Sequence, residues 1–336
     1  MPVPPPSAAA LPLHGGDLAA AERRWGRPAL GWLDLSTGIN PHPYPLPALA
    51  PALWTRLPGA ADEAALIGAA RHRFAAATKV EIVAAPGSQA LIQALPRLRP
   101  PGPVAILTPT YAEHARAWSA AGHTVASIDD PAAADPAGML VLVNPNNPTG
   151  RRFAPADLIG LAARFAASGG LLVIDEAFAD PDPELSLIPS LPAATLVLRS
   201  FGKFHGLAGL RLGFAVTAEA GLAEGLRRGF GPWAVSGPAL AIGAAALADD
   251  AWAEANRARL AADQARLVGL LTSAGLELVG GTPLFTLVRH PEAARLWERL
   301  GQAGILVRAF DVQPDWLRIG LPGDETGFER LARALG

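Results

Sequence analysis

A lysine inside a glycine-rich turn is the first group in this chain whose type and setting suggest chemistry. The chain holds only two lysines, Lys79 and Lys203, beside 26 arginines, and Lys203 lies in the glycine-containing run Ser200–Arg211. A guanidinium stays protonated in proteins, whereas a partly buried amine can lose its proton and form a Schiff base with a carbonyl compound. We therefore predict that Lys203 binds an aldehyde.

Two neighbours of Lys203 indicate which aldehyde it would bind. Ser200, three residues earlier, offers a hydroxyl, and Arg211, eight residues later, offers a guanidinium that can hold a phosphate with two hydrogen bonds. An aldehyde that carries a phosphate is pyridoxal phosphate, so the three residues together predict this cofactor. A lone Gly-x-Lys would instead indicate a surface loop with a solvated lysine.

Asp175 is the second candidate catalytic residue, because it ends the apolar run 171–174. A carboxylate at the end of a buried strand is costly unless a cation meets it, and a protonated pyridine nitrogen would be such a cation. The alternatives are a buried ion pair with an arginine or a metal ligand. We predict no metal site, because no histidine stands at ligand spacing from Asp175.

Three further groups follow apolar runs that predict strands. Gly87 opens a predicted helix whose first amides can bind phosphate, and Tyr111 can stack on a flat ring. Asn147 lies in the segment 144–150, which holds three of the chain's five asparagines. Taken singly, these groups are explained as a helix cap, a core tyrosine and turn chemistry.

The order of predicted elements places these groups together. Apolar runs alternate with helical patterns, which favours an α/β fold with a mostly parallel sheet and helices on both faces. Ligands in such sheets bind at the carboxyl ends of the strands, where the candidate residues lie. The strands that they follow are expected over residues 80–84, 104–107, 139–143, 170–175 and 194–198.

The second half of the chain predicts a smaller α+β domain of short strands around a helix over residues 291–303. We expect an N-terminal arm and part of the small domain over 1–45, a large cofactor-binding domain over 46–235 and a small domain over 236–336. Arg318 lies inside the apolar run 317–319 and suits a substrate carboxylate, although a surface arginine on an edge strand would look the same.

Composition excludes several classes of protein. With 50% hydrophobic and 17% charged residues and a net charge of −2, the chain is typical of a globular protein and lacks the basic stripe of nucleic-acid binders. It holds no cysteine, which excludes disulfides and is compatible with a cytoplasmic location. The first 13 residues predict a flexible arm, not a signal peptide, and no run predicts a membrane span.

The motifs at 144–150, 175–178 and 200–211 resemble those of fold-type I pyridoxal-phosphate enzymes of the aspartate-aminotransferase superfamily, near the histidinol-phosphate aminotransferase branch. The resemblance runs from about His14 to the end of the chain. It implies the fold of these enzymes, with a mostly parallel central sheet, helices on both faces and a smaller α+β domain. It also implies a homodimer.

The resemblance assigns roles to the matching residues. Lys203 and Asp175 would be the catalytic residues, binding the aldehyde carbon and the ring nitrogen of the cofactor. The ring would stack on Tyr111, and Asn147 would bind its phenolic oxygen. The phosphate would be bound by Gly87, Ser88, Gln89, Ser200 and Arg211. The substrate would be bound by His14, Gly38, Asn40, Asn147 and Arg318.

Within this superfamily, the runs His14–Asp17 and Asp34–Pro41 are most similar to L-threonine-O-3-phosphate decarboxylases of cobalamin biosynthesis. This similarity implies decarboxylation of L-threonine O-3-phosphate to (R)-1-amino-2-propanol O-2-phosphate. The alternative is an aminotransferase, such as one that acts on histidinol phosphate, in which the Cα–H bond breaks instead. A cofactor-binding regulator is a third class, but such proteins usually carry a DNA-binding domain, for which this chain shows no basic helix.

Two positions depart from the pattern of the superfamily. Phe178 stands where a tyrosine usually follows the aspartate that binds the ring nitrogen, so one hydroxyl beside the phenolic oxygen of the cofactor is lost. Leu57 stands where a tyrosine usually reaches the phosphate bound by the neighbouring subunit, so the resemblance leaves that contact between subunits in doubt.

Overall fold

Runs of Val, Ile and Leu form the strands of the main sheet in the computed structural model, which describes residues 14–336. The flexible arm expected over residues 1–13 lies outside this range. The chain divides into two compact units. Unit 2 is His42–Leu260, and unit 1 combines Ala261–Gly336 with the described residues up to Pro41.

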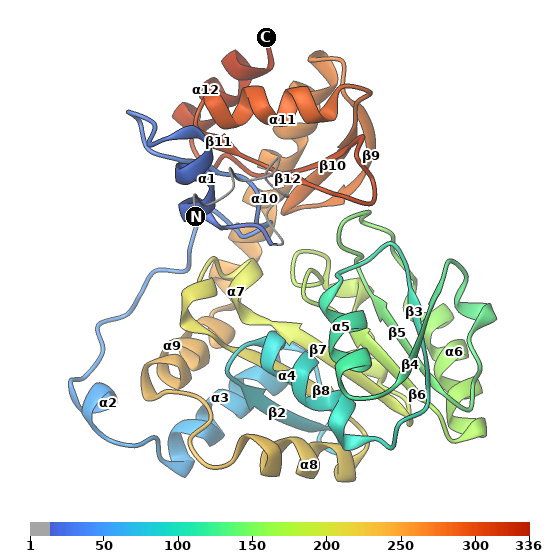
Figure 1. Cartoon of the computed structure of the whole chain (residues 1–336). Coiled ribbons are helices and arrows are strands. Elements are labelled where there is room, and N and C mark those ends of the chain that lie inside the picture. The colour runs from blue at the N-terminus through green and yellow to red at the C-terminus, as the bar shows by residue number, and fades with distance from the viewer. Residues whose placement is uncertain (1–13) are drawn as a thin grey trace, which may run out of the picture. The chain divides into compact units, whose positions relative to one another are not determined.

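Unit 2 is built on a seven-stranded sheet with the strand order β2-β8-β7-β6-β5-β3-β4 (Figure 1). Strand β8 runs antiparallel to both of its neighbours, β2 and β7, and the pairs formed by the remaining strands are parallel. The mostly parallel sheet predicted from the sequence is therefore confirmed. The strands are β2 (Glu81–Ala85), β3 (Pro103–Leu107), β4 (Thr124–Ile128), β5 (Met139–Val143), β6 (Leu171–Asp175), β7 (Thr195–Ser200) and β8 (Gly213–Thr217).

The central strands β5, β6, β7 and β8 are buried on both faces because their side chains alternate between two separate cores. In β5, Leu140 and Leu142 belong to one core, while Met139 and Val141 belong to the other. Helices α3, α6 and α9 pack on the first core, and α4, α5 and α8 pack on the second. The helices of unit 2 are α2 (Ala52–Thr55), α3 (Ala60–Arg73), α4 (Ser88–Ala94), α5 (Glu113–Ala120), α6 (Pro155–Ser168), α7 (Phe201–Phe204), α8 (Ala220–Phe230) and α9 (Gly237–Ala248).

Unit 1 contains the smaller α+β arrangement predicted for the end of the chain. Its antiparallel sheet has the order β12-β13-β10-β9, and β1 pairs with β11 in a separate parallel pair. The strands are β1 (Leu33–Asp34), β9 (Glu277–Thr282), β10 (Phe285–Arg289), β11 (Ile305–Leu306), β12 (Arg308–Ala309) and β13 (Trp316–Gly320). The helices are α1 (Leu18–Trp25), α11 (Ala293–Gln302) and α12 (Glu325–Leu335).

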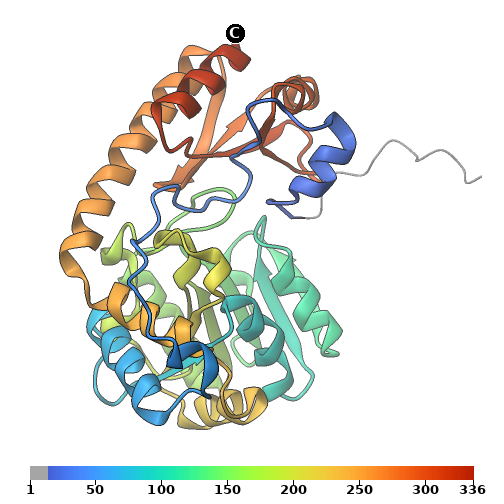
Figure 2. The ribbon, with the colours of Figure 1, turned by 90° about the vertical axis from the view of Figure 1, so that its left-hand side faces the viewer.

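Unit 2 ends inside a helix, and the helix before that one packs in the core of unit 2. Helix α10 (Asp250–Ser273) is the long orange helix at the left of Figure 2, and it runs without a break from unit 2 into unit 1. Helix α9 packs its Ala239 and Leu240 into the core that also holds Leu66 and Ala70 of α3. The boundaries at 45/46 and 235/236, which the sequence suggested, stay a prediction of which segments fold as separate domains.

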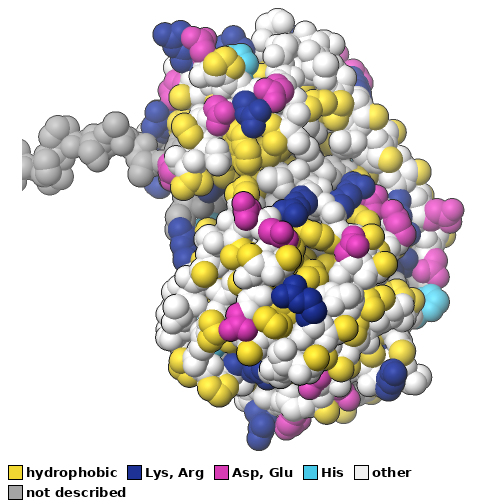
Figure 3. Space-filling view, turned by 90° about the vertical axis from the view of Figure 1, so that its right-hand side faces the viewer, with side chains coloured by type: hydrophobic (Ala, Val, Ile, Leu, Met, Phe, Trp, Pro, Cys, Tyr) yellow, Lys and Arg dark blue, Asp and Glu magenta, His cyan; other side chains and the backbone are white. Residues whose placement is uncertain are grey.

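The surface carries charges of both signs. On the face drawn in Figure 3, basic and acidic side chains are interspersed with hydrophobic ones. Among residues 14–336, no helix combines the length and the apolar character that a membrane crossing requires.

Candidate active site

Strand pairing brings most of the predicted site residues of unit 2 to one edge of its sheet. Gly213, at the start of β8, pairs with Ala85 at the end of β2 and with Ser200 at the end of β7. Because β8 runs opposite to its neighbours, its first residue lies beside their last ones. The loops that follow β3, β5 and β6 leave from the same edge, since these strands run parallel to β7.

Gly87 and Arg211 form a narrow cradle at this edge. Gly87 has φ of +88°, and a Cβ atom placed on it would lie 2.8 Å from Nη2 of Arg211. The positive φ favours glycine, and the absence of a side chain leaves room for the guanidinium beside the backbone. A Cβ on Gly213 would collide with the backbone nitrogen of Ser88, so the start of α4 also lies directly against β8. Ser200 ends β7, the strand that lies between β8 and the strand β6 that carries Asp175.

Asp175 is buried, with 3% of its surface exposed, and its carboxylate has two partners. Its Oδ2 lies 3.0 Å from Nε2 of His114, and its Oδ1 accepts a hydrogen bond of 2.9 Å from the backbone N–H of Ala177. His114 comes from α5 and is itself 1% exposed. These two contacts hold the carboxylate in one orientation at the end of β6.

Lys203 is the third residue of the four-residue helix α7, which is too short to be stable by itself. Tertiary contacts hold it instead: Nδ2 of Asn256 donates to the carbonyl of Phe204 at 3.3 Å. The backbone N–H of Tyr44 donates to the carbonyl of His205 at 2.9 Å. Nζ of Lys203 lies 5.6 Å from the ring centroid of Phe178, the residue that replaces the expected tyrosine.

Tyr111 lies after β3 and is held by Gln89 of α4. Its hydroxyl donates to Oε1 of Gln89 at 3.2 Å, and burial raises the pKa of Tyr111 to about 12. The loop that carries Asn147 is joined to the loop of Tyr111 by Asn146, whose Oδ1 accepts a hydrogen bond of 2.7 Å from Thr110. The two loops therefore have a fixed relation to each other.

The remaining predicted site residues belong to unit 1. Arg318 is 6% exposed on β13, its guanidinium lies 5.1 Å from the ring centroid of Phe285, and it donates to the carbonyl of Ser36. Asn40 is buried a few residues later in the same segment, and Gly38 between them has φ of +62°. Arg318 is thus a buried arginine beside the 36–40 segment, not a surface arginine. His14 is exposed in this unit.

Two buried groups at the sheet edge were missed by the sequence analysis. His114 stands one helical turn after Tyr111, a spacing that could have pointed to it. Arg199 is 4% exposed and pairs with Glu176 at 3.0 Å and with Asp180. Arg199 lies in an apolar strand, so the signal for it was the same as for Arg318: one charge among hydrophobic residues.

Comparison with known proteins places the chain in a family. The model of the family described as aminotransferase class I and II matches residues 60–335. The chain belongs to this family. A protein of Pseudomonas aeruginosa and one of Sinorhizobium sp., each named threonine-phosphate decarboxylase, are 47% and 49% identical to this member. Each alignment covers 96% of this chain, and it covers 96% of the Pseudomonas protein and 97% of the Sinorhizobium protein.

A solved structure confirms the fold of this family member. Histidinol-phosphate aminotransferase from Sinorhizobium meliloti, in complex with pyridoxal-5′-phosphate, superposes with a TM-score of 0.80 at 22% identity. The match covers 94% of this chain and 92% of the other. The fold-type I architecture that the resemblance implied is therefore shown.

The residues at the sheet edge of this aminotransferase-family chain fit a phosphorylated pyridine aldehyde. The Gly87–Arg211 cradle offers a cation and a backbone without a side chain, which suits a phosphate. Asp175 offers a buried carboxylate for a cationic ring nitrogen, and Lys203 offers an amine. The set contains the donors, acceptor and nucleophile that such a group requires.

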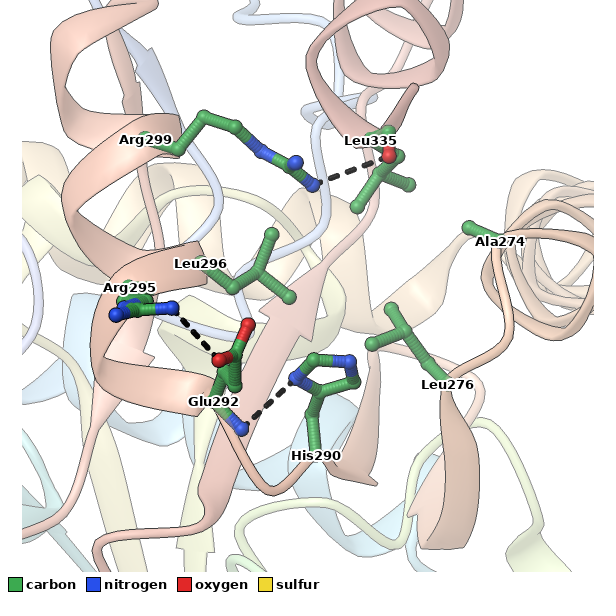
Figure 4. Close-up of a pocket in the computed structure, with 8 residues that line it drawn as sticks. All are labelled: Ala274, Leu276, His290, Glu292, Arg295, Leu296, Arg299 and Leu335. Atoms are coloured by element: carbon green, nitrogen blue, oxygen red, sulfur yellow. Dashed lines mark hydrogen bonds and ion pairs between the residues drawn. The ribbon is translucent and has the colours of Figure 1, made fainter.

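A pocket of about 190 Å³ in unit 1 lies apart from these residues (Figure 4). Its arginines already have partners, since Arg295 bonds to Glu292 at 2.8 Å and Arg299 bonds to the carbonyl of Leu335 at 3.1 Å. None of the predicted site residues lines it. We therefore base the function on the sheet edge and not on this pocket.

Proposed function

We propose that this chain is a pyridoxal-phosphate-dependent carboxy-lyase that converts L-threonine O-3-phosphate into (R)-1-amino-2-propanol O-2-phosphate and carbon dioxide. The observation that carries the proposal is the identity of 49% and 47%, over 96% of the chain, with two proteins named threonine-phosphate decarboxylase. We further propose that the product serves cobalamin biosynthesis.

In this proposal one set of residues holds the ring and aldehyde of the cofactor, and another set holds its phosphate. In this proposal Lys203 binds its aldehyde carbon, Asp175 faces its ring nitrogen, Tyr111 stacks on the ring and Asn147 binds the phenolic oxygen. Its phosphate is bound by Gly87, Ser88, Gln89, Ser200 and Arg211. The narrow contact between Gly87 and Arg211 supports this assignment, because an anion there can meet backbone N–H groups and a guanidinium together.

The chain's own residues prepare the site for decarboxylation. When bound, pyridoxal phosphate supplies an electron sink for the bond that breaks at Cα. Asp175 would hold a proton at the ring nitrogen, because a carboxylate close to that nitrogen favours its cationic form. His114 and the N–H of Ala177 keep Asp175 aimed at that position. Phe178 leaves the phenolic-oxygen side with one hydroxyl fewer, and its ring lies near Nζ of Lys203.

Substrate binding is proposed for the residues of unit 1, together with Asn147. Arg318 would bind the substrate carboxylate with two parallel hydrogen bonds, since its guanidinium is buried and oriented by Ser36. His14, Gly38 and Asn40 would complete this binding set. Fixing the carboxylate in one position decides which Cα bond stands perpendicular to the cofactor ring, and thus which bond breaks.

The competing function is an aminotransferase that breaks the Cα–H bond, as in the histidinol-phosphate aminotransferase whose structure this chain resembles at 22% identity. The two reactions need the same cofactor and differ in the products. Only decarboxylation releases carbon dioxide, and only transamination consumes a keto acid such as 2-oxoglutarate.

The test is incubation of the purified holoenzyme with L-threonine O-3-phosphate. We expect stoichiometric carbon dioxide and aminopropanol phosphate without any keto acid in the mixture. Turnover that requires 2-oxoglutarate and yields a keto product would show an aminotransferase instead. Histidinol phosphate, tested in the same way, is expected to give no turnover.

The chain provides a matched control for the cofactor lysine, because it holds only one other lysine, Lys79, which is exposed. Borohydride treatment of the holoenzyme should attach the cofactor covalently to Lys203, detected by peptide mass. Lys203→Ala should remove the label and lower turnover by at least about a thousandfold. Lys79→Ala should change neither, and a label on Lys79 would contradict the assignment.

We also propose that the chain acts as a homodimer in the cytoplasm. Large hydrophobic side chains lie exposed on unit 2, among them Leu46, Trp54, Leu57 and Trp233, at 59–68% exposure. Trp54 and Leu57 stand three residues apart in the sequence, and exposed side chains of this size indicate a surface that a partner covers. Leu57 is the residue at the position where the superfamily reaches the neighbouring subunit, which supports a second copy of this chain as the partner.

A further inference from the structure

The geometry points to Glu113 as a positioning residue that fixes the ring of Tyr111 through the side chain of Gln89. This inference rests on the proposed function, in which Tyr111 stacks on the cofactor, and it adds a residue that does not touch the cofactor itself. Glu113 is the first residue of α5, and Gln89 is the second residue of α4.

The three side chains form a chain of hydrogen bonds whose direction is determined. The hydroxyl of Tyr111 donates to Oε1 of Gln89 at 3.2 Å, and Nε2 of Gln89 donates to Oε2 of Glu113 at 3.2 Å. A carboxylate can only accept, so Glu113 forces the amide of Gln89 to turn its oxygen towards Tyr111. With a pKa raised by burial to about 12, the phenol keeps its proton and donates.

The outer end of the chain is anchored by Arg116. Its Nη1 donates to Oε1 of Glu113 at 2.6 Å, one turn along α5. The side chain of Glu113 is only 13% exposed, whereas that of Arg116 is 45% exposed. A carboxylate removed from water to this extent is stable only when it accepts hydrogen bonds. The bonds from Arg116 and from Gln89 both serve this purpose.

This chain of bonds joins the two ends of the proposed cofactor site. Gln89 lies in the first turn of α4, whose first residues are assigned to the phosphate, while Tyr111 is assigned to the ring. A hydrogen bond at the hydroxyl fixes where the far end of the Tyr111 side chain lies, and stacking requires the ring to stay in one place. Glu113 therefore helps to fix the position of the Tyr111 ring relative to the site where the phosphate binds. The rings of Tyr111 and His114 also stand nearly perpendicular, at 87°, with their centroids 6.2 Å apart.

The first measurement uses the protein without cofactor. The chain has two tyrosines, so labelling tyrosine with ¹³C at the Cζ atom gives two resonances, and Tyr44→Phe identifies that of Tyr111. In Glu113→Ala we expect the Tyr111 resonance to shift and broaden, because Gln89 can then rotate and its bond to the phenol is lost. Glu113→Gln keeps a carbonyl acceptor for Gln89 and should restore most of the original signal.

Arg116→Ala separates positioning from a structural ion pair. It removes the arginine that donates to Glu113 but leaves the carboxylate beside Gln89, so the Tyr111 resonance should stay close to that of the wild type. If Glu113 served only as half of an ion pair that stabilises α5, Arg116→Ala and Glu113→Ala would lower the melting temperature alike, and neither would move the Tyr111 resonance. That pair of results would overturn the inference.

The second measurement uses the holoenzyme. We expect Glu113→Ala to raise the dissociation constant of pyridoxal phosphate by about 3- to 10-fold, the usual effect of one lost hydrogen bond, and to change the visible circular dichroism of the bound cofactor. Arg116→Ala should change both by less than about twofold. Unaltered dichroism and affinity in Glu113→Ala would contradict the inference.

The two measurements can reject the proposed function and the role of Glu113 independently of each other. If the wild-type protein takes up no pyridoxal phosphate, the proposed function is wrong, while the tyrosine resonances of the cofactor-free protein still test the role of Glu113. If the cofactor binds and threonine phosphate is decarboxylated, but Glu113→Ala leaves Tyr111 unmoved, only the positioning role is wrong.

Discussion

His205, two residues after Lys203, shows how packing controls the protonation of a single residue. Its ring is 1% exposed and stacks between Phe201 and Trp252, with centroid distances of 4.1 and 5.5 Å. Its Nδ1 lies 3.2 Å from the carbonyl of Phe201. Burial is the main cause that lowers the pKa of His205 to about 4 from 6.5, against the attraction of Asp180. The ring is therefore neutral at physiological pH.

The lowered pKa of His205 predicts a loss of stability in mild acid. Between pH 6.5 and about 4, the unfolded chain binds a proton at this residue that the folded chain does not. The free energy of unfolding should therefore fall as the pH falls through this window, by about 3 kcal/mol in total from His205. Above pH 6.5 its contribution is constant.

The control is His205→Phe, which keeps an aromatic ring between Phe201 and Trp252 and cannot titrate. Urea unfolding of both proteins at several pH values gives the difference in free energy of unfolding. We expect the wild type to lose stability relative to His205→Phe as the pH is lowered from 6.5 to 4. A difference that stays constant over this range would show that His205 is not the residue responsible.

At the scale of the elements, a buried ion-pair network joins the ends of strands β6 and β7, close in the sequence to the two proposed catalytic residues. Glu176 follows Asp175 at the end of β6, and Arg199 lies at the end of β7, shortly before Lys203. Arg199 bonds to Glu176 at 3.0 Å and to Asp180, and all three are buried. Buried charges of this kind are sensitive to the loss of one partner, because the others are left unpaired in a medium of low polarity.

Removing the arginine alone should be more harmful than removing the whole network. Arg199→Met leaves two buried carboxylates without their cation, and we expect it to lower the free energy of unfolding by about 3–5 kcal/mol. The triple variant Arg199→Met, Glu176→Gln and Asp180→Asn should recover most of that loss. Denaturant unfolding measures both. An equal loss of unfolding free energy in the two variants would mean that the size and shape of the side chains, and not their charge, determine stability at this network.

For the whole molecule, the exposed hydrophobic side chains of unit 2 are the feature that a single chain leaves unexplained. Trp54 is 68% exposed and Leu57 is 63% exposed, although water contact with such groups is unfavourable. A dimer that covers them would account for their presence.

We predict that the 34.7 kDa chain sediments as a dimer in analytical ultracentrifugation. Trp54→Ser combined with Leu57→Ser should raise the dissociation constant of the dimer by about tenfold or more, because buried tryptophans dominate the energy of interfaces. Val312→Ser, at a hydrophobic side chain of unit 1 that is more exposed still, at 83%, serves as the control and should have no effect. A wild-type protein that is monomeric at all concentrations would contradict the proposed dimer.

Local sequence patterns predicted most of the elements because those patterns express packing within one element. The run 139–143 alternates between two cores, and a carboxylate or lysine at the end of such a run stands out chemically. Asp17 stands just before a helical pattern, where aspartate is typical of a helix cap, and its Oδ1 accepts a hydrogen bond of 2.8 Å from Ala20 N–H. Helix α12 was not predicted, although Asp324 caps it and Phe328 and Leu331 lie on its buried face. Its short amphipathic pattern was overlooked.

Residue types at short spacing were enough to predict the α/β class, to single out Lys203 and Asp175 as candidates, and to carry the resemblance that pointed to pyridoxal phosphate. The partners of those residues became visible only in the folded chain. His114 meets Asp175 across 61 positions, and Gln89 meets Glu113 across 24. Such contacts leave no local pattern, since they arise only when separate strands are paired and their loops leave from one edge of a sheet.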